Sequence, residues 1–144
     1  MMPRKPKGKT PQIRDRIKEL RRVSASMLRA NPKNWRTHPP AQVSAMQAVL
    51  AEIGFADAML ARETEDGLEL IDGHLRQEIM GDQLVPVLVV DVTEEEADKL
   101  LLTLDPLAAM AGMDRDAVAA LLDGISWSNG FARDMLETLD MVMP

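Results

Sequence analysis

Leu68-Glu69-Leu70-Ile71-Asp72-Gly73-His74-Leu75-Arg76 decides the fold, because strand-like residues run into a glycine turn and then directly into helix-like residues. The turn carries an acid, an imidazole and a guanidinium. Backbone N–H groups at a helix N-terminus bind anions, phosphates above all. The chain has two histidines, and one of them lies in this turn. The stretch therefore predicts a strand–turn–helix unit and the first candidate site.

The segments around this turn alternate between helix and strand patterns. Apolar residues spaced three and four apart predict helices, whereas β-branched runs and hairpin signals predict strands. Thr93 and Glu96 match a capping box, which marks the start of a helix. The order is that of an α+β domain. The expected elements are helices at 41–53, 74–80 and 93–104, and strands at 58–62, 68–71 and 85–91.

The N-terminal residues predict a basic arm rather than part of the domain. Residues 1–11 are polar and interrupted by prolines, so we expect them to be disordered. Residues 12–22 predict a short basic helix, and residues 23–28 predict a weak strand. We therefore expect residues 1–22 to form a basic, largely flexible arm in front of a domain that spans 23–112.

The C-terminal residues 113–144 predict a helical extension. Asp105-Pro106 should end the preceding helix, because proline removes a backbone donor. One further helix is expected from about Asp114 and another after Gly130. The residues that these helices should bury are Val118, Leu121, Leu122 and Ile125 in the first and Phe131, Met135, Leu139 and Val142 in the second.

Composition limits the chemistry that the chain can perform. Hydrophobic residues make up 46% of it but aromatic residues only 3%, and eleven methionines predict an aliphatic, adaptable core. The absence of cysteine excludes disulfides, thiolate metal sites and a cysteine nucleophile. No apolar run approaches the roughly 20 residues of a membrane span, and the basic N-terminus lacks the apolar segment of a signal peptide. We expect a cytoplasmic protein that does not enter a membrane.

The net charge of −6 conceals a division of the chain by sign. Residues 1–40 carry +10 and the remaining residues carry −16. Such a split predicts a basic arm that binds a polyanion beside an acidic body. A solvated tail that pairs with the acidic body explains the split equally well. The candidate DNA-binding residues are Arg4, Lys5, Lys7, Lys9, Arg14, Lys18, Arg21 and Arg22.

The glycine turn is the leading candidate for a phosphate site. Gly73 permits a close backbone approach, and Arg76 can add a bidentate contact to phosphate. His74 can donate to a phosphate oxygen, act as an acid or base, or join Asp72 in holding a divalent metal. The structural alternative has Asp72 capping the helix, His74 packed beside it and Arg76 paired with a surface acid. Spacing alone favours that alternative, because strand–glycine–helix turns are common.

The loop 31–40 is the second candidate site. Asn34, Arg36 and His38 can reach a phosphate or a base, and Trp35 can stack on one. In the alternative interpretation, which we favour for Trp35, the indole anchors the loop to the core. Trp127 is most simply a packing residue between the last helices.

The order of these motifs resembles the ParB N-terminal domain of the ParB/sulfiredoxin superfamily over residues 23–112. The pattern also looks like that of ParB-like proteins of phages and mobile elements, which often accompany DNA-modifying enzymes. The resemblance implies a ParB/sulfiredoxin-like small mixed sheet with packed helices, followed here by the helical extension. The stretches that carry it are Leu28-Arg-Ala-Asn-Pro32, Arg36, Glu52-Ile-Gly-Phe55, Leu70-Ile-Asp-Gly-His-Leu-Arg76, Val85-Pro-Val-Leu-Val89, Thr93–Leu102 and Leu104-Asp-Pro-Leu-Ala108.

The resemblance implies a nucleotide pocket at the glycine turn. In chromosome-partition members this turn reads Gly-Glu-Arg-Arg and handles CTP, and Gly73 and Arg76 match its first and last positions. His74 replaces the glutamate linked to hydrolysis, and Leu75 replaces an arginine, which favours nucleotide binding over hydrolysis. Members with Asp-Gly-His-His-Arg are ATPases or nucleases, and Leu75 breaks that motif. Sulfiredoxin activity needs a cysteine where His74 stands, so it is excluded.

Three functions follow as hypotheses. The first is a domain that binds a nucleoside triphosphate with Mg2+ and acts with DNA. In this hypothesis Asp72 and His74 hold the metal and perform any catalysis. The phosphate is held by Gly73, His74, Arg76 and Arg36. The second is a non-catalytic module that docks a protein partner, such as a DNA-modifying enzyme, through its acidic helices. The third is a small-molecule kinase of the same superfamily, with Asp72 or Glu78 as the base.

Overall fold

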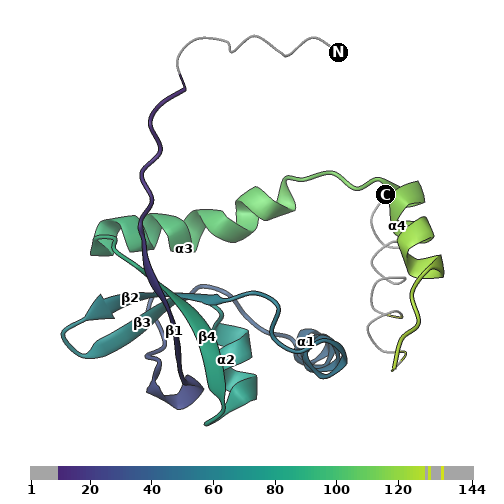
Figure 1. Cartoon of the computed structure of the whole chain (residues 1–144), viewed down its shortest axis with the longest axis horizontal. Helices are drawn as coiled ribbons and strands as arrows, with labels where there is room; N and C mark the ends of the chain where they lie inside the picture. Colours follow the sequence, from purple (N-terminus) through teal and green to yellow (C-terminus); the bar gives the residue numbers. More distant parts are fainter. Residues whose placement is uncertain (1–9, 129, 131–133, 135–144) are drawn as a thin grey trace.

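A mixed sheet organises residues 10–128, 130 and 134, which are the residues that the computed structural model describes (Figure 1). Within this part of the chain, the strands are β1 (Ile17–Ser24), β2 (Met59–Thr64), β3 (Gly67–Asp72) and β4 (Leu84–Val90), in the order β1-β4-β2-β3. The β2–β4 pair is parallel, and β1–β4 and β2–β3 are antiparallel. The predicted α+β class with a small mixed sheet is confirmed.

The helices begin where local sequence signals place them. The elements are the 3-10 turn η1 (Ala25–Met27) and the helices α1 (Pro40–Glu52), α2 (His74–Met80), α3 (Glu94–Ala109) and α4 (Arg115–Asp123). At the start of α3, the Glu96 N–H donates to the Thr93 hydroxyl at 3.2 Å and the Thr93 N–H donates to the Glu96 carboxylate at 2.9 Å. The predicted capping box is therefore confirmed.

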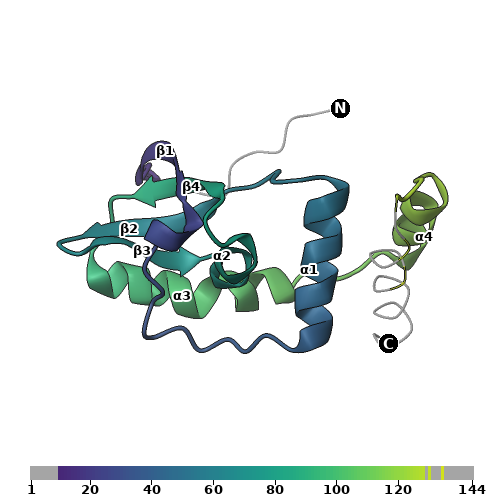
Figure 2. The same ribbon diagram turned by 90° about the horizontal axis from the view of Figure 1, so that it is seen from below.

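Alternation along the strands divides the core between two faces of the sheet. Val85, Val87 and Val89 of β4 are buried on the face that η1 covers, together with Met59 and Ala61 of β2. On the opposite face, Ile71 and Val90 pack against Ala97 of α3. Figure 1 shows α3 on one side of the sheet and α2 on the other, and Figure 2 shows α1 beside the sheet next to α2. Hence β3 ends and α2 begins next to α1.

The helix predicted over residues 12–22 is wrong, because Ile17–Ser24 form strand β1. Leu20 pairs with Leu88, and Val23 pairs with Val85. Hydrogen bonds to β4 satisfy this backbone, and a partner about 65 residues away leaves no local sequence signal. The strand predicted over 23–28 is also wrong in extent, since η1 follows Ser24. Residues 17–22 of the predicted arm thus lie in the sheet, and the division into arm, domain and extension stays a prediction.

The predicted break at Asp105-Pro106 is also wrong, because α3 continues through Pro106 to Ala109. Proline removes one N–H from the helix, but the carbonyl it would have bonded belongs to Leu102, whose residue is 62% exposed and open to water. Within the described residues, no helix is long and apolar enough to cross a membrane.

The predicted burial of α4 is wrong as well. The helix starts as expected, with the Asp114 carboxylate accepting from the Ala117 N–H at 3.1 Å. However, Leu121 is 66% exposed and Ile125 is 44% exposed, and no residue of α4 is buried among the described residues. The helix expected after Gly130, with Phe131, Met135, Leu139 and Val142, lies outside the described residues, as do residues 1–9 of the segment expected to be disordered.

Candidate functional site

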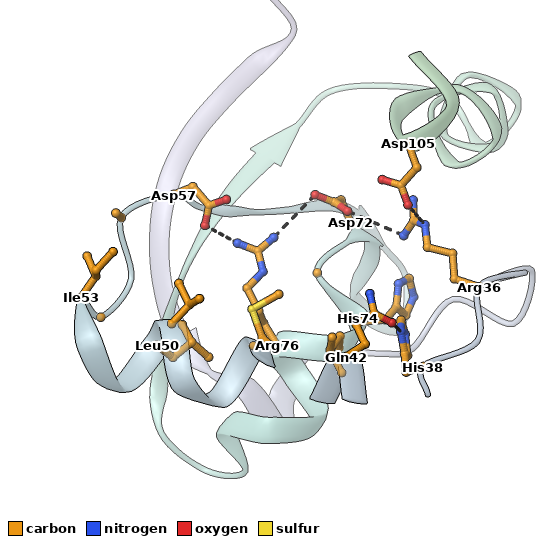
Figure 3. Close-up of a pocket in the computed structure, with 16 residues that line it drawn as sticks. Arg36, His38, Gln42, Leu50, Ile53, Asp57, Asp72, His74, Arg76 and Asp105 are labelled. Carbon is orange, nitrogen blue, oxygen red and sulfur yellow. Dashed lines mark hydrogen bonds and ion pairs between the residues drawn. The ribbon is translucent and has the colours of Figure 1, made fainter. Parts of the chain in front are cut away.

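A cavity of about 520 Å³ lies where β3 ends and α2 begins (Figure 3). Its volume falls within the range of small-molecule sites. Apolar side chains of α1 form one wall, and charged side chains form the opposite wall. The apolar lining is Met46, Val49, Leu50 and Ile53, and the polar lining includes Arg36, His38, Gln42, Asp57, Asp72, His74, Arg76 and Asp105. All the predicted residues of the glycine turn and Arg36 therefore meet at one cavity.

Gly73 is required by both backbone and packing. Its φ of 113° lies in the left-handed region that favours glycine. A Cβ at this position would lie 2.7 Å from the Cγ of Met59, which is fully buried.

The side chain of Asp72 does not cap α2, so this part of the structural alternative is wrong. Its other two parts are confirmed, since His74 is buried and Arg76 pairs with the exposed Asp57. The side chain of Asp72 faces two guanidiniums instead.

An ion-pair chain runs along the charged wall in the order Asp57, Arg76, Asp72, Arg36, Asp105 (Figure 3). Arg76 contacts Asp57, and its Nη2 lies 3.5 Å from Asp72 Oδ2. Arg36 contacts Asp105, and its Nη1 lies 3.6 Å from Asp72 Oδ1. The side chains of Arg76 and Arg36 are only 10% and 12% exposed. The cavity thus holds two nearly buried guanidiniums on either side of one carboxylate.

His74 is held neutral beside these charges. The residue is 4% exposed, and its Nε2 accepts a hydrogen bond from the Asn31 backbone N–H at 3.1 Å. The proton of the neutral ring therefore lies on Nδ1, which is buried without a partner among the described residues. Burial, followed by the positive charge of Arg36, lowers the pKa of His74. In this arrangement the imidazole offers a donor but no free lone pair.

This tautomer bears on the predicted metal pair of Asp72 and His74. Both residues line the cavity, but the Nε2 lone pair of His74 is engaged by Asn31. Among residues 10–128, 130 and 134, no group of three or more His, Asp or Glu side chains is arranged to hold a metal. Glu78, the second base considered for a kinase, is exposed and does not line the cavity. Asp72 is the carboxylate that the turn contributes to the cavity lining.

The loop 31–39 is fastened to α3 and presents Arg36 to the cavity. The Trp35 indole N–H donates to the carbonyl of Leu101 at 3.0 Å, which attaches the loop to α3, but Trp35 is 50% exposed, so the predicted anchor in the core is wrong. The Arg36 guanidinium carbon lies 5.6 Å from the centre of the Trp35 ring, within cation–π distance. Asn34 accepts from the Arg36 N–H within the loop at 3.4 Å. His38 lines the same cavity and contacts Gln42 at 3.2 Å.

Sequence reasoning missed Asp57 and Asp105, the two ends of the ion-pair chain. Asp57 lies in the irregular segment between α1 and β2, and Asp105 was taken as part of a helix break. Neither position carries a local motif. The excess of acidic residues beyond residue 40 was a weak signal that carboxylate partners for the arginines lie there, because buried guanidiniums require carboxylates.

Basic residues of β1 and the segment before it are paired with the acidic body. Arg14 and Arg16 contact Glu96, whereas Lys18 and Arg21 contact Glu63. Intramolecular pairing, the alternative to a free basic arm, is thus confirmed for Arg14, Lys18 and Arg21. Arg22 is exposed on β1. The candidates Arg4, Lys5, Lys7 and Lys9 lie outside the described residues.

The similarities of this chain to known proteins are found in their structures and not in their sequences. No protein-family model matches the sequence, and no curated protein sequence matches it significantly. The C-terminally truncated chromosome-partitioning protein ParB from Caulobacter crescentus, complexed with CTP-gamma-S, is similar with a TM-score of 0.62 and 16% identity. A Pnob8-like ParB-N domain has a TM-score of 0.50 and 18% identity, and sulfiredoxin from Arabidopsis thaliana has 0.48 and 15%.

The coverage of these matches differs. The Caulobacter match covers 73% of this chain and 61% of the Caulobacter chain. The Pnob8-like match covers 86% of this chain and 47% of the other, and the sulfiredoxin match covers 58% of this chain and 97% of the other. This chain therefore spans less than two thirds of the Caulobacter protein. At these identities the likeness establishes a fold, and the phage or mobile-element type stays a prediction. The chain has the ParB/sulfiredoxin-like fold.

Proposed function

We propose that the cavity binds a nucleoside triphosphate, or a related phosphate ligand, and that the chain is a ParB-like domain that acts with DNA. One observation carries this proposal: two nearly buried guanidiniums, from Arg36 and Arg76, converge on one wall of a cavity whose other wall is apolar. Guanidiniums recognise phosphate through charge-assisted, bidentate hydrogen bonds. An apolar wall suits a base or sugar. The Caulobacter protein of the same fold is complexed with CTP-gamma-S, which supports a nucleotide as the ligand.

The charges of the cavity favour a ligand that arrives with a divalent cation. The wall holds two guanidiniums and three carboxylates, so its net charge is −1 when both histidines are neutral. A bare triphosphate would be repelled by this excess. Mg2+ offsets the charge and accepts oxygen ligands, and Asp72 lies between the two phosphate-binding arginines. Asp72 is therefore the residue we assign to Mg2+.

The neutral His74 donates from Nδ1 to a phosphate oxygen in this proposal. That N–H is buried and unpartnered among the described residues, and a ligand would satisfy it. Nucleotide hydrolysis or DNA nicking is the catalytic extension of the proposal, in which Asp72 would hold the metal ion and the ion would supply the activation of water. DNA would lie along the basic residues of the N-terminal segment and β1, where phosphate contacts position a duplex without reading sequence.

A specific observation favours a second function, the docking of a protein partner. The C-terminal half of α3, helix α4 and the residues just after each helix expose large apolar side chains to solvent. They are Leu102, Leu107, Met110, Leu121 and Ile125, each at least 44% exposed. This function requires no ligand in the cavity, so it survives a double Arg36→Ala, Arg76→Ala replacement that abolishes nucleotide binding.

Isothermal titration with ATP, CTP and GTP, with and without Mg2+, tests the proposal. We expect at least one nucleotide to bind, and Arg76→Ala to raise its Kd by about tenfold or more. Arg29→Ala is the matched control. The Nη1 of Arg29 lies 2.9 Å from Asp66 Oδ2 in an exposed ion pair, and this pair is not part of the cavity. Circular dichroism verifies the fold of each variant. Absence of heat for all three nucleotides, or equal losses in Arg29→Ala and Arg76→Ala, would contradict the proposal.

A further inference from the structure

The ends of the ion-pair chain differ from its middle in exposure. The side chain of Asp57 is 77% exposed and that of Asp105 is 51% exposed, whereas Asp72 is 32% exposed. The guanidiniums that they contact are nearly buried. Figure 3 shows Asp57 and Asp105 at opposite ends of the charged wall, with Asp72 between the arginines. The two end carboxylates therefore reach from solvent onto groups inside the cavity.

A phosphate ligand and these two carboxylates require the same donors. Arg76 donates from Nη1 to Asp57, and the Nε of Arg36 forms an ion-pair contact with Asp105. Asp57 lies in the irregular segment between α1 and β2, so its side chain can turn into water without breaking a helix or strand. Asp72 is fixed at the end of β3 and contacts both arginines. Exchange is thus easiest at the ends of the chain.

We propose that Asp57 and Asp105 occupy the places of the ligand's anionic groups, so that a ligand binds by displacing them from Arg76 and Arg36. This inference rests on the proposed nucleotide function and adds the ligand class to it. Two displaceable carboxylates on either side of Asp72 select a ligand with two linked anionic groups, such as a di- or triphosphate, over a single phosphate. The carboxylates also keep both guanidiniums in place when no ligand is bound.

Replacement of each end carboxylate by its amide tests this exchange. Asp57→Asn removes the competitor from Arg76 and keeps the side-chain shape. Asp66→Asn is a closely matched control, since Asp66 is also 77% exposed and also pairs with one arginine, but on the β2–β3 hairpin. Asp57→Glu restores a carboxylate and should bind as the wild type does. The probes are inorganic triphosphate, orthophosphate and CTP, titrated calorimetrically with and without Mg2+.

We expect Asp57→Asn and Asp105→Asn each to lower the Kd for triphosphate by about tenfold, with Asp66→Asn unchanged and orthophosphate weaker than triphosphate. If the wild type binds triphosphate or CTP but Asp57→Asn binds it equally or more weakly, the exchange is refuted while nucleotide binding stands. If the wild type and both amide variants bind none of the three probes, the proposed nucleotide site itself fails.

Discussion

Arginines of the cavity and basic residues of β1 both contact carboxylates, but burial separates the two groups. The side chains of Arg36 and Arg76 are 12% and 10% exposed, whereas those of Lys18 and Arg21 are 56% and 38% exposed. Exposed ion pairs contribute about 0–1 kcal/mol and are screened by salt. Removal of one partner from a buried pair costs considerably more. The cavity therefore holds its guanidiniums at defined positions, although their partners Asp57 and Asp105 are exposed, whereas on β1 both members of each pair are open to a polyanion.

Arg76→Ala should produce the largest effect and tests this difference directly. It removes a side chain that is only 10% exposed, together with the packing of its stem, and leaves Asp72 with one cation instead of two, so we expect a loss of about 3 kcal/mol of unfolding free energy. Arg21→Ala, which removes an exposed cation, should cost less than about 1 kcal/mol. Urea unfolding followed by circular dichroism measures both. Equal losses would remove the distinction between the two groups.

Gly73→Ala should be the next largest change, and it sharpens the view of the cavity as a tightly built site. The substitution combines a positive φ with a clash against the buried Met59, so we expect about 2–3 kcal/mol of destabilisation. Gly67→Ala in the β2–β3 hairpin has a similar φ of 117° but open space around the new Cβ. It should cost about 1 kcal/mol. Thermal unfolding of the two variants isolates the contribution of the clash.

The pH dependence of stability reports on the burial of His74. Its pKa is lowered in the folded protein, so the unfolded state binds more protons between that lowered pKa and the ordinary value of 6.5. Stability should be complete above pH 6.5 and fall as the pH decreases below it. Denaturant titrations between pH 5 and 8 should show this slope, and His74→Asn should flatten it. A slope of the same size in His74→Asn would assign the effect to other groups.

Glu63→Gln should produce the smallest effect and probes the β1 side of the comparison. Glu63 contacts Lys18 and Arg21, and its replacement frees Lys18 for DNA, whereas Arg21 still contacts Glu19. We expect duplex DNA to bind about two- to threefold more tightly at low salt. Glu65→Gln, at the tip of the same hairpin, is the control. Fluorescence anisotropy across a salt series measures both variants, and identical affinities would exclude Glu63 as a competitor of DNA.

Much of the fold was predictable because its signals are local. The capping box at Thr93, the hairpin at Asp66-Gly67 and the strand–turn–helix unit at Gly73 each lie within a few residues. Strand β1 was not predictable in the same way, because Ile13, Ile17 and Leu20 are spaced as on a helix face. Its conformation depends on pairing with β4, which is remote in sequence.

The residues of the candidate site also divide into those with a local sequence signal and those without one. The turn residues and Arg36 were predicted, and the structure brings them to one cavity, although their roles stay predictions. Asp57 and Asp105 were missed because their importance depends on three-dimensional contacts with arginines 19 and 69 positions away in sequence. The Nδ1 proton of His74 was equally beyond sequence reasoning, since the Asn31 backbone fixes it.

A crystal structure grown with CTP and Mg2+ tests the central claim most directly. We expect phosphate oxygens within hydrogen-bonding distance of Arg36 and Arg76, with Asp57 turned away from Arg76 and the base against the apolar wall of α1. A structure in which the triphosphate lies elsewhere, with Arg76 still contacting Asp57, would contradict the claim.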